Sequence, residues 1–204
     1  MIEIETPHGP ARAHLHPVSG ARGAMILGHG AGGGVAARDL VTAMSAANAA
    51  GFTVALVEQP YRVAGRRSPA PAHHLDAAWI AIVEHLRAHE LSRLPVIAGG
   101  RSSGARVACR TSDTVGASAV LCLAFPLEPP SRGAPRPSRL PELDAVTVPT
   151  LVVQGRTDRF GMPPPARLRT VVQVTGDHSL RTDLASIGAA IEGWLGEILV
   201  AFTT

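Results

Sequence analysis

The chain has 204 residues, of which 46% are hydrophobic and 3% aromatic, and its formal net charge is +3. The hydrophobic fraction excludes a disordered chain, and no apolar run approaches the roughly 18 to 20 residues that a membrane-spanning helix needs. All 19 basic residues are arginines, which excludes mechanisms that need a lysine Schiff base or a phosphate-loop lysine. We therefore expect one domain over residues 1–204 with no membrane partner. Because the arginines are not interleaved with aromatic residues, we expect no nucleic-acid partner either.

The N-terminal segments alternate between apolar and polar residues. This pattern over Ile2–Glu5 and Ala13–His16 predicts an antiparallel edge hairpin with one solvated face. The first residues contain neither the basic region nor the apolar region of a secretory signal, so we expect a cytoplasmic location.

Six later segments are near-continuous apolar runs, which are typical of strands in a parallel sheet that is covered on both faces. These runs are Met25–Leu27, Thr53–Val57, Val96–Ala98, Ala119–Phe125, Leu151–Val153 and Val171–Val174. Between several of them, apolar residues recur at helical spacings of three and four. The helical stripes are Leu40, Met44 and Ala47; Leu75, Trp79, Ile82, Val83 and Leu86; and Leu184, Ile187, Ile191, Trp194 and Ile198. The sequence therefore predicts an α/β fold with a doubly wound, mostly parallel sheet and ligands at the carboxyl ends of its strands.

A glycine-rich loop, Gly28–Gly34, follows the first of these runs. Gly28, Gly30 and Gly33 fit the spacing G-x-G-x-x-G, so a dinucleotide-binding oxidoreductase is one hypothesis, with Glu58 as its acidic residue. That acid lies somewhat farther along the chain than usual, and the hypothesis leaves the later motifs unexplained. For His29 we expect a structural hydrogen bond.

The segment Gly100–Gly104 has the spacing G-x-S-x-G between an apolar run and a helical pattern. Glycine two residues before and after Ser102 allows a strand and a helix to approach closely, while the serine holds a strained turn. Ser102 is therefore the candidate nucleophile.

Two further polar residues follow strand ends later in the chain. Asp158 comes just after the run Leu151–Val153, and His178 comes just after Val171–Val174. We expect His178 to act as the base and Asp158 as the acid that orients it. Asp177 is the rival acid, but adjacent residues in a tight loop seldom face each other well.

Residues 126–141 are rich in proline and arginine, which argues against a regular helix or strand there. Arg101, Arg62, Arg66 and Arg67 are expected near strand exits, where they are placed to attract an anionic substrate. For any single one of these arginines, a solvated surface position is the preferred interpretation.

We assign no catalytic or metal-binding role to the remaining histidine and cysteine candidates. His85 and His89 are one helical turn apart, but no third acidic or thiol ligand was apparent, so we expect no metal site. Cys109 and Cys122 are expected to be buried and reduced.

The chain resembles small lidless members of the α/β-hydrolase superfamily, with Tex30/KANL3-like and dienelactone-hydrolase-like branches. The matching motifs are His29–Gly32, Gly100–Gly104, Arg156–Gly161 and Gly176–Leu180, and the order Ser, Asp, His is the superfamily's order. The resemblance implies an α/β-hydrolase fold. It also implies that the stretch 126–141, where other members insert a cap domain, is too short to build one.

The resemblance further implies a serine hydrolase that cleaves an ester or related acyl bond of a small molecule, without cofactor or metal. Ala31, or a neighbouring glycine, and Ser103 would supply the backbone N–H groups of the oxyanion hole. Gly30, Gly32 and Arg101 are the residues expected to contact the substrate. A non-catalytic binding module with a hydrolase fold remains an alternative, because a protein can keep the fold of an enzyme family without its activity.

Overall fold

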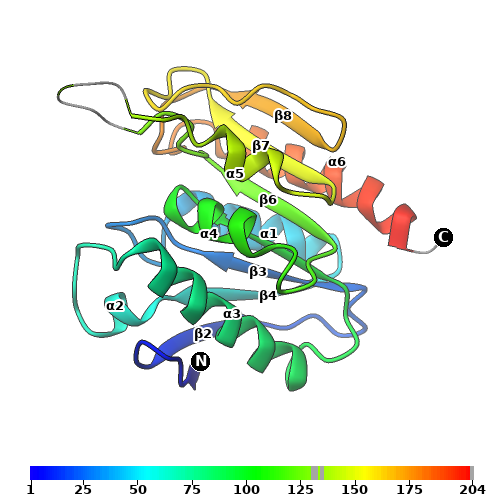
Figure 1. Cartoon of the computed structure of the whole chain (residues 1–204). Helices are drawn as coiled ribbons and strands as arrows, with labels where there is room; N and C mark the ends of the chain where they lie inside the picture. Colours follow the sequence, from blue (N-terminus) through cyan, green and yellow to red (C-terminus); the bar gives the residue numbers. More distant parts are fainter. Residues whose placement is uncertain (130–132, 134–135, 203–204) are drawn as a thin grey trace.

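The apolar runs of the sequence form strands of an eight-stranded sheet, and these strands run across the view in Figure 1. The computed structural model describes residues 1–129, 133 and 136–202. The strands are β1 (Ile2–Ile4), β2 (Ala11–His16), β3 (Gly23–Gly28), β4 (Phe52–Glu58), β5 (Val96–Arg101), β6 (Ala119–Leu123), β7 (Thr150–Gly155) and β8 (Arg169–Val174). Their order in the sheet is β1-β2-β4-β3-β5-β6-β7-β8.

The sheet is antiparallel at its N-terminal edge and parallel elsewhere. Strands β1 and β2 pair antiparallel, β2 pairs antiparallel with β4, and all strands from β4 to β8 run parallel. The predicted fold class and N-terminal hairpin are therefore confirmed. Strand β8 differs from its prediction as a covered strand: it lies at the open edge of the sheet, and its central residues are only partly buried or exposed.

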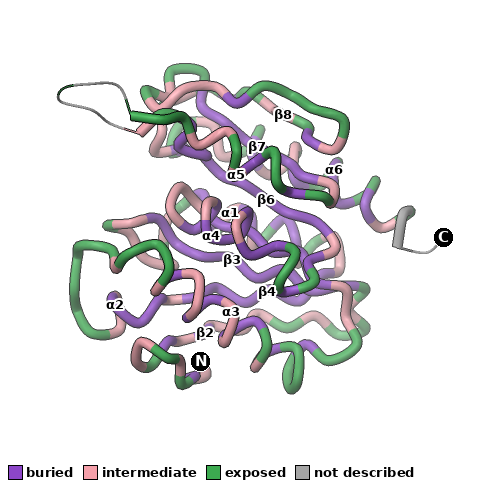
Figure 2. The backbone as a smooth tube through the Cα atoms, in the orientation of Figure 1, coloured by how far each residue is buried: buried purple, intermediate pink, exposed green. Residues whose placement is uncertain are grey.

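Helices cover both faces of the sheet. They are α1 (Arg38–Ala49), α2 (Pro60–Val63), α3 (Ala72–Ala88), α4 (Ser103–Thr111), α5 (Leu140–Asp144) and α6 (Leu184–Phe202). One buried cluster joins the sheet to α3 and α4 around Trp79 and Ile82, and a second joins it to α1 and α6 around Leu40 and Ile187. Figure 2 shows the strands between these helices as mostly buried backbone.

The connection from β6 to α5 contains no helix or strand among its described residues, which agrees with the absence of a cap domain. Pro130, Arg132 and Pro135 of the proline-rich stretch lie outside the described residues. Pro141 differs from expectation because it belongs to α5. It sits at the second helical position, where the N–H that proline lacks would have had no partner within the helix.

Among the described residues, no helix combines the length and the hydropathy needed to cross a membrane. The location expected from the sequence stays a prediction.

Candidate active site

The structure places Ser102 on a sharp turn between β5 and α4. Its backbone has φ 51° and ψ −105°, a conformation that is rare for residues with a side chain. Strain of this kind costs of order 1–3 kcal/mol and persists only where the surroundings enforce it. The hydrogen bond from the Ser102 N–H to the carbonyl of Leu123, at 2.9 Å, anchors the turn to the neighbouring strand.

The glycines of the G-x-S-x-G motif are required by close packing against β3. A Cβ on Gly100 would lie 2.5 Å from the carbonyl oxygen of Gly28, and a Cβ on Gly104 would clash with that same carbonyl. Real Cβ atoms do not approach a backbone oxygen so closely. The spacing in the sequence therefore reflects the contact of β3, β5 and α4 that holds Ser102 in place.

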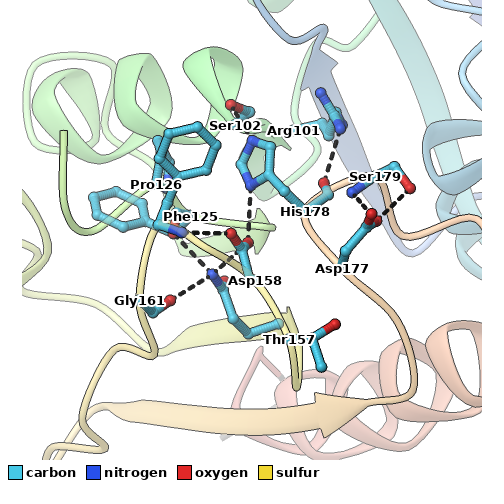
Figure 3. A network of polar contacts seen from close by, with 12 residues as sticks. Arg101, Ser102, Phe125, Pro126, Thr157, Asp158, Gly161, Asp177, His178 and Ser179 are labelled. Atoms are coloured by element: carbon cyan, nitrogen blue, oxygen red, sulfur yellow. Dashed lines mark hydrogen bonds and ion pairs between the residues drawn. The ribbon is translucent and has the colours of Figure 1, made fainter. Parts of the chain in front are cut away.

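Ser102, His178 and Asp158 form one chain of hydrogen bonds (Figure 3). Ser102 Oγ lies 2.9 Å from His178 Nε2, and His178 Nδ1 lies 2.8 Å from Asp158 Oδ2. The three residues come from the loops after β5, β8 and β7, which end at the same edge of the parallel sheet. The structure thus brings together all three residues that the sequence selected.

The Asp158 side chain is fully buried, with 0% exposed, and receives hydrogen bonds from three donors. Besides His178, these are the Gln154 side-chain amide at 2.8 Å and the Phe160 N–H at 2.9 Å. At both contacts an N–H group donates to a carboxyl oxygen of Asp158. An ionised carboxylate accepts only, so His178 Nδ1 carries a proton and Nε2 is free to accept from Ser102.

Gln154 and Phe160 belong to the site although the sequence analysis did not select them. Gln154 is buried at the end of β7, and its amide also lies 3.0 Å from the carbonyls of Phe125 and Gly161. The Phe160 ring meets the His178 imidazole edge-on, with centroids 4.4 Å apart. A polar residue closing an otherwise apolar strand was the one available signal for Gln154.

Asp177, the rival acid, faces away from the imidazole (Figure 3). Its Oδ1 accepts hydrogen bonds from the N–H of Ser179 at 2.8 Å and from the Ser179 hydroxyl at 2.5 Å. These bonds lower the pKa of Asp177 below its usual value. The acid that contacts His178 is therefore Asp158.

The Arg101 side chain contacts the loop after β8 that carries His178. One terminal nitrogen donates to the His178 carbonyl at 2.8 Å, while Nε donates to Asp39 Oδ2 at 3.2 Å. The Asp39 side chain is 2% exposed, and burial raises its pKa, an effect that the neighbouring Arg101 opposes. A Cβ on Gly30 would lie 2.7 Å from another nitrogen of this guanidinium, so Arg101 also packs against the glycine-rich loop.

The glycine-rich loop after β3 is ordered by His29, which is 3% exposed. His29 Nδ1 lies 2.9 Å from the Gly30 carbonyl, and the Gly33 N–H donates to the same carbonyl at 3.0 Å. Because a trans peptide points its N–H opposite to its C=O, the Ala31 N–H is directed away from these partners. Ser103 is the first residue of α4, so its N–H has no acceptor within that helix.

The residues expected to contact a substrate line one pocket beside the hydrogen-bonded chain of Ser102, His178 and Asp158. Gly30, Gly32 and Arg101 share a pocket of about 460 Å³ with Ser179, the residue after His178. Their predicted role in substrate binding stays a prediction.

The dinucleotide hypothesis is not favoured by the same loop. Helix α1 begins at Arg38, five residues after Gly33, so the third glycine does not open a helix as that motif requires. Glu58, the candidate ribose ligand, instead pairs with His14 at 3.0 Å.

Two groups lie outside the site. Glu90 brings a carboxylate within 4.8 Å of ligand atoms of His85 and His89, a neighbour that the sequence analysis did not select. The absence of a metal there stays a prediction. Cys109 and Cys122 are both free and buried, with sulfurs 3.5 Å apart; their contact and burial raise the pKa of Cys122, as for an unreactive thiol.

Solved structures with the same fold include several lidless hydrolases and esterases. An α/β serine hydrolase without lid from Xanthomonas campestris is 17% identical with a TM-score of 0.76, and the match covers 96% of this chain and 93% of that one. Est1E from Butyrivibrio proteoclasticus, with bound ferulic acid, is 15% identical with a TM-score of 0.79, covering 98% and 100%. Dienelactone hydrolase from Anabaena variabilis is 15% identical with a TM-score of 0.74, covering 96% and 95%.

No curated protein matches the sequence. The sequence profile of the alpha/beta hydrolase domain matches residues 21–196, a span that contains the glycine-rich loop and the three hydrogen-bonded residues. The chain therefore belongs to the alpha/beta hydrolase family, and it has the fold of that family's lidless serine hydrolases.

Proposed function

We propose that the protein is a carboxylesterase-like serine hydrolase that cleaves an ester or related acyl bond of a small molecule. The observation that carries this proposal is the continuous hydrogen-bond chain from Ser102 through His178 to a fully buried Asp158. Membership of a hydrolase family and the fold shared with esterases support it.

The first chemical step is acylation of the serine. His178 Nε2 takes the proton of Ser102 as Oγ attacks the substrate carbonyl, and Asp158 stabilises the imidazolium that forms. The Ala31 and Ser103 N–H groups donate to the oxygen that becomes negative. His178 then gives its proton to the leaving alcohol.

Deacylation repeats these steps with water. His178 removes a proton from a water molecule, which attacks the acyl-enzyme, and the returning proton restores Ser102. All proton transfers use groups of this chain and water. The same neutral form of His178, with its proton on Nδ1, therefore starts both halves of the cycle.

Labelling with a fluorophosphonate probe tests the nucleophile. We expect the wild type to be labelled and Ser102→Ala to be unlabelled. Ser103→Ala is the matched control, because it removes a neighbouring hydroxyl but keeps the backbone N–H. Hydrolysis of 4-nitrophenyl acetate should fall by about 10³-fold or more in Ser102→Ala. A wild type that is neither labelled nor active would favour the non-catalytic binding module.

A further inference from the structure

A second pocket opens at the same edge of the sheet, beyond the end of β4. Its volume is about 720 Å³, and it is lined by the start of α2, the connection from α2 to α3, and the first turn of α3. His8, from the turn between β1 and β2, closes one side. The connection forms the projecting loop beside α2 in Figure 1.

The charged groups of this pocket are two arginines, and two histidines lie with them. Arg66, Arg67, His8 and His74 line it, and none of its lining residues is an aspartate or glutamate. Within the part of the chain that the structure describes, neither Arg66 nor Arg67 forms an ion pair. The rings of His8 and His74 stack with centroids 3.8 Å apart, so the two histidines face the pocket as a pair.

Some arginines elsewhere in the chain are neutralised by carboxylates. Arg110 binds Asp76 with two hydrogen bonds of 2.6 and 2.8 Å, and Arg106 pairs with Glu142. Arg66 and Arg67 both line the pocket without an ion pair among the described residues, so an anion bound there would meet two uncompensated positive charges. A carboxylate or phosphate also matches the forked donors of arginine.

The pocket adjoins the nucleophile segment. Gln59, Tyr61 and Leu75 line it, and the same three residues line a small cavity whose other wall includes Ser103 and Gly104. Strand β4 is two strands from β5 in the sheet. With neighbouring strands about 4.8 Å apart, the exit of β4 lies roughly 10 Å from the exit of β5, which carries Ser102.

The remaining lining is apolar or uncharged. Pro60, Ala70 and Leu75 offer apolar surface, and Tyr61 is almost fully buried in the wall. Gln59 is also buried, and among the described residues its Oε1 has no hydrogen-bond partner. The pocket therefore suits an amphiphilic molecule, with an anionic group at the arginines and an apolar portion against the prolines and leucine.

We propose that this pocket, through Arg66 and Arg67, binds a carboxylate or phosphate group of the substrate whose carbonyl Ser102 attacks. The substrate class is thus an acyl ester with a negatively charged end. That the anion belongs to a substrate rests on the proposed function, whereas the binding of the anion does not.

Calorimetric titration tests the anion site without turnover. The probes are phenyl phosphate and benzoate, with neutral benzamide as the uncharged comparison, titrated into Ser102→Ala. We expect one or both anions to bind more tightly than benzamide. Adding Arg66→Gln and Arg67→Gln should weaken anion binding about tenfold or more, because two charge-assisted hydrogen bonds are lost. The two anions together distinguish a phosphate site from a carboxylate site.

The matched control removes the same charge from exposed arginines outside this pocket and the pocket beside Gly30. Arg93 and Arg167 are exposed and without an ion pair among the described residues, as Arg66 and Arg67 are. Arg93→Gln with Arg167→Gln should leave anion binding within about twofold. Equal losses in the two double variants, or a loss only in the control, would overturn the proposal. Unchanged melting temperatures show that the variants are folded.

Substrate preference tests the link to catalysis. The 4-nitrophenyl monoester of suberic acid carries a carboxylate about 9 Å from its ester carbonyl, and 4-nitrophenyl octanoate is its neutral counterpart. We expect kcat/KM to favour the suberate ester, and the preference to fall about tenfold in the Arg66, Arg67 variant.

The two proposals fail in different ways. If Ser102 is labelled by the fluorophosphonate but kcat/KM does not favour the suberate ester, the anion site is contradicted and the proposed hydrolase function stands. If anions bind through Arg66 and Arg67 but Ser102 is not labelled, the anion site stands and the proposed hydrolase function is contradicted.

Discussion

The two arginine-rich regions at the carboxyl edge of the sheet differ in how their charges are neutralised. Arg101, beside the Ser102 turn, pairs with buried Asp39 and donates to the backbone of His178. Arg66 and Arg67, in the connection from α2 to α3, are exposed and line a pocket without a carboxylate. The charge of Arg101 is therefore neutralised inside the protein, whereas the charges of Arg66 and Arg67 have no internal carboxylate partner and can bind an anion.

This difference indicates what each region requires. The proton transfer that we propose between Ser102 and His178 needs atoms fixed to within about half an ångström, and paired, buried charges fix them. Recognition of a charged substrate end needs donors that meet no internal competitor. Removing a partner should therefore be costly in the first region and nearly neutral for folding in the second.

The largest effect is expected from Asp158→Asn. Asparagine can donate to His178 Nδ1, which would leave the proton of the imidazole on Nε2, where it cannot accept from Ser102. We expect kcat for 4-nitrophenyl acetate to fall about 10³- to 10⁴-fold. Asp177→Asn is the control, since asparagine still accepts from Ser179, and it should stay within about twofold of wild type. A comparable loss in both variants would remove the distinction between the two acids.

The next effect concerns folding stability and Arg101. In Arg101→Gln the Asp39 carboxylate remains buried without its cation, which typically costs about 3–5 kcal/mol of unfolding free energy. Urea denaturation measures this loss. Arg66→Gln is the matched control in the unpaired region and should change stability by about 0.5 kcal/mol or less. Similar losses in both variants would erase the contrast between the regions.

The Arg101→Gln deficit should also depend on pH. Burial raises the pKa of Asp39 above 3.8, and removing Arg101 raises it further. Between 3.8 and the raised pKa the folded state binds more protons than the unfolded state, so stability falls as pH rises through that window. The deficit should therefore shrink on acidification toward pH 4. Adding Asp39→Asn should recover part of the loss at pH 7, because no charge then stays buried.

Motifs that are local in sequence could be predicted, because their spacing follows from nearby backbone contacts. Gly100 and Gly104 must lack a Cβ because both pack against the carbonyl of Gly28. The five-residue motif therefore identifies Ser102 from the sequence alone. Asp158 and His178 could be found because each follows an apolar run, and parallel strands bring such ends to one edge. The edge position of β8 could not be predicted, since an apolar run does not state how many neighbours a strand has.

The supporting contacts could not be predicted because they depend on loop paths. Arg101 and Asp39 are 62 residues apart, and either alone looks like an ordinary charged residue near a helix or strand end. Gln154 supports Asp158 only because the intervening turn folds back over its amide. The Arg66, Arg67 pocket likewise depends on His8 reaching across from the first hairpin.

The smallest effect is expected at His29, which connects the two regions. Its Nδ1 orders the glycine-rich loop, and its Nε2 accepts from the N–H of Gln59, a lining residue of the 720 Å³ pocket. Protonation would place an N–H against the Gln59 donor, and burial lowers the pKa of His29 below 6.5. Between that lowered pKa and 6.5 the unfolded state binds more protons, so stability rises with pH there and is lost on acidification.

Substituting His29→Gln should remove this contribution to the pH dependence. The slope of unfolding free energy against pH below 6.5 should then be shallower than in wild type by at most about 1.4 kcal/mol per pH unit. Urea midpoints at pH 7.5, 6.5 and 5.5 measure both slopes, and the difference between them isolates His29 from the other histidines. Parallel slopes would show that His29 accepts a proton equally well in the folded and unfolded chains. That result would contradict a neutral, buried His29 whose Nε2 accepts from Gln59, the contact that joins the glycine-rich loop to the 720 Å³ pocket.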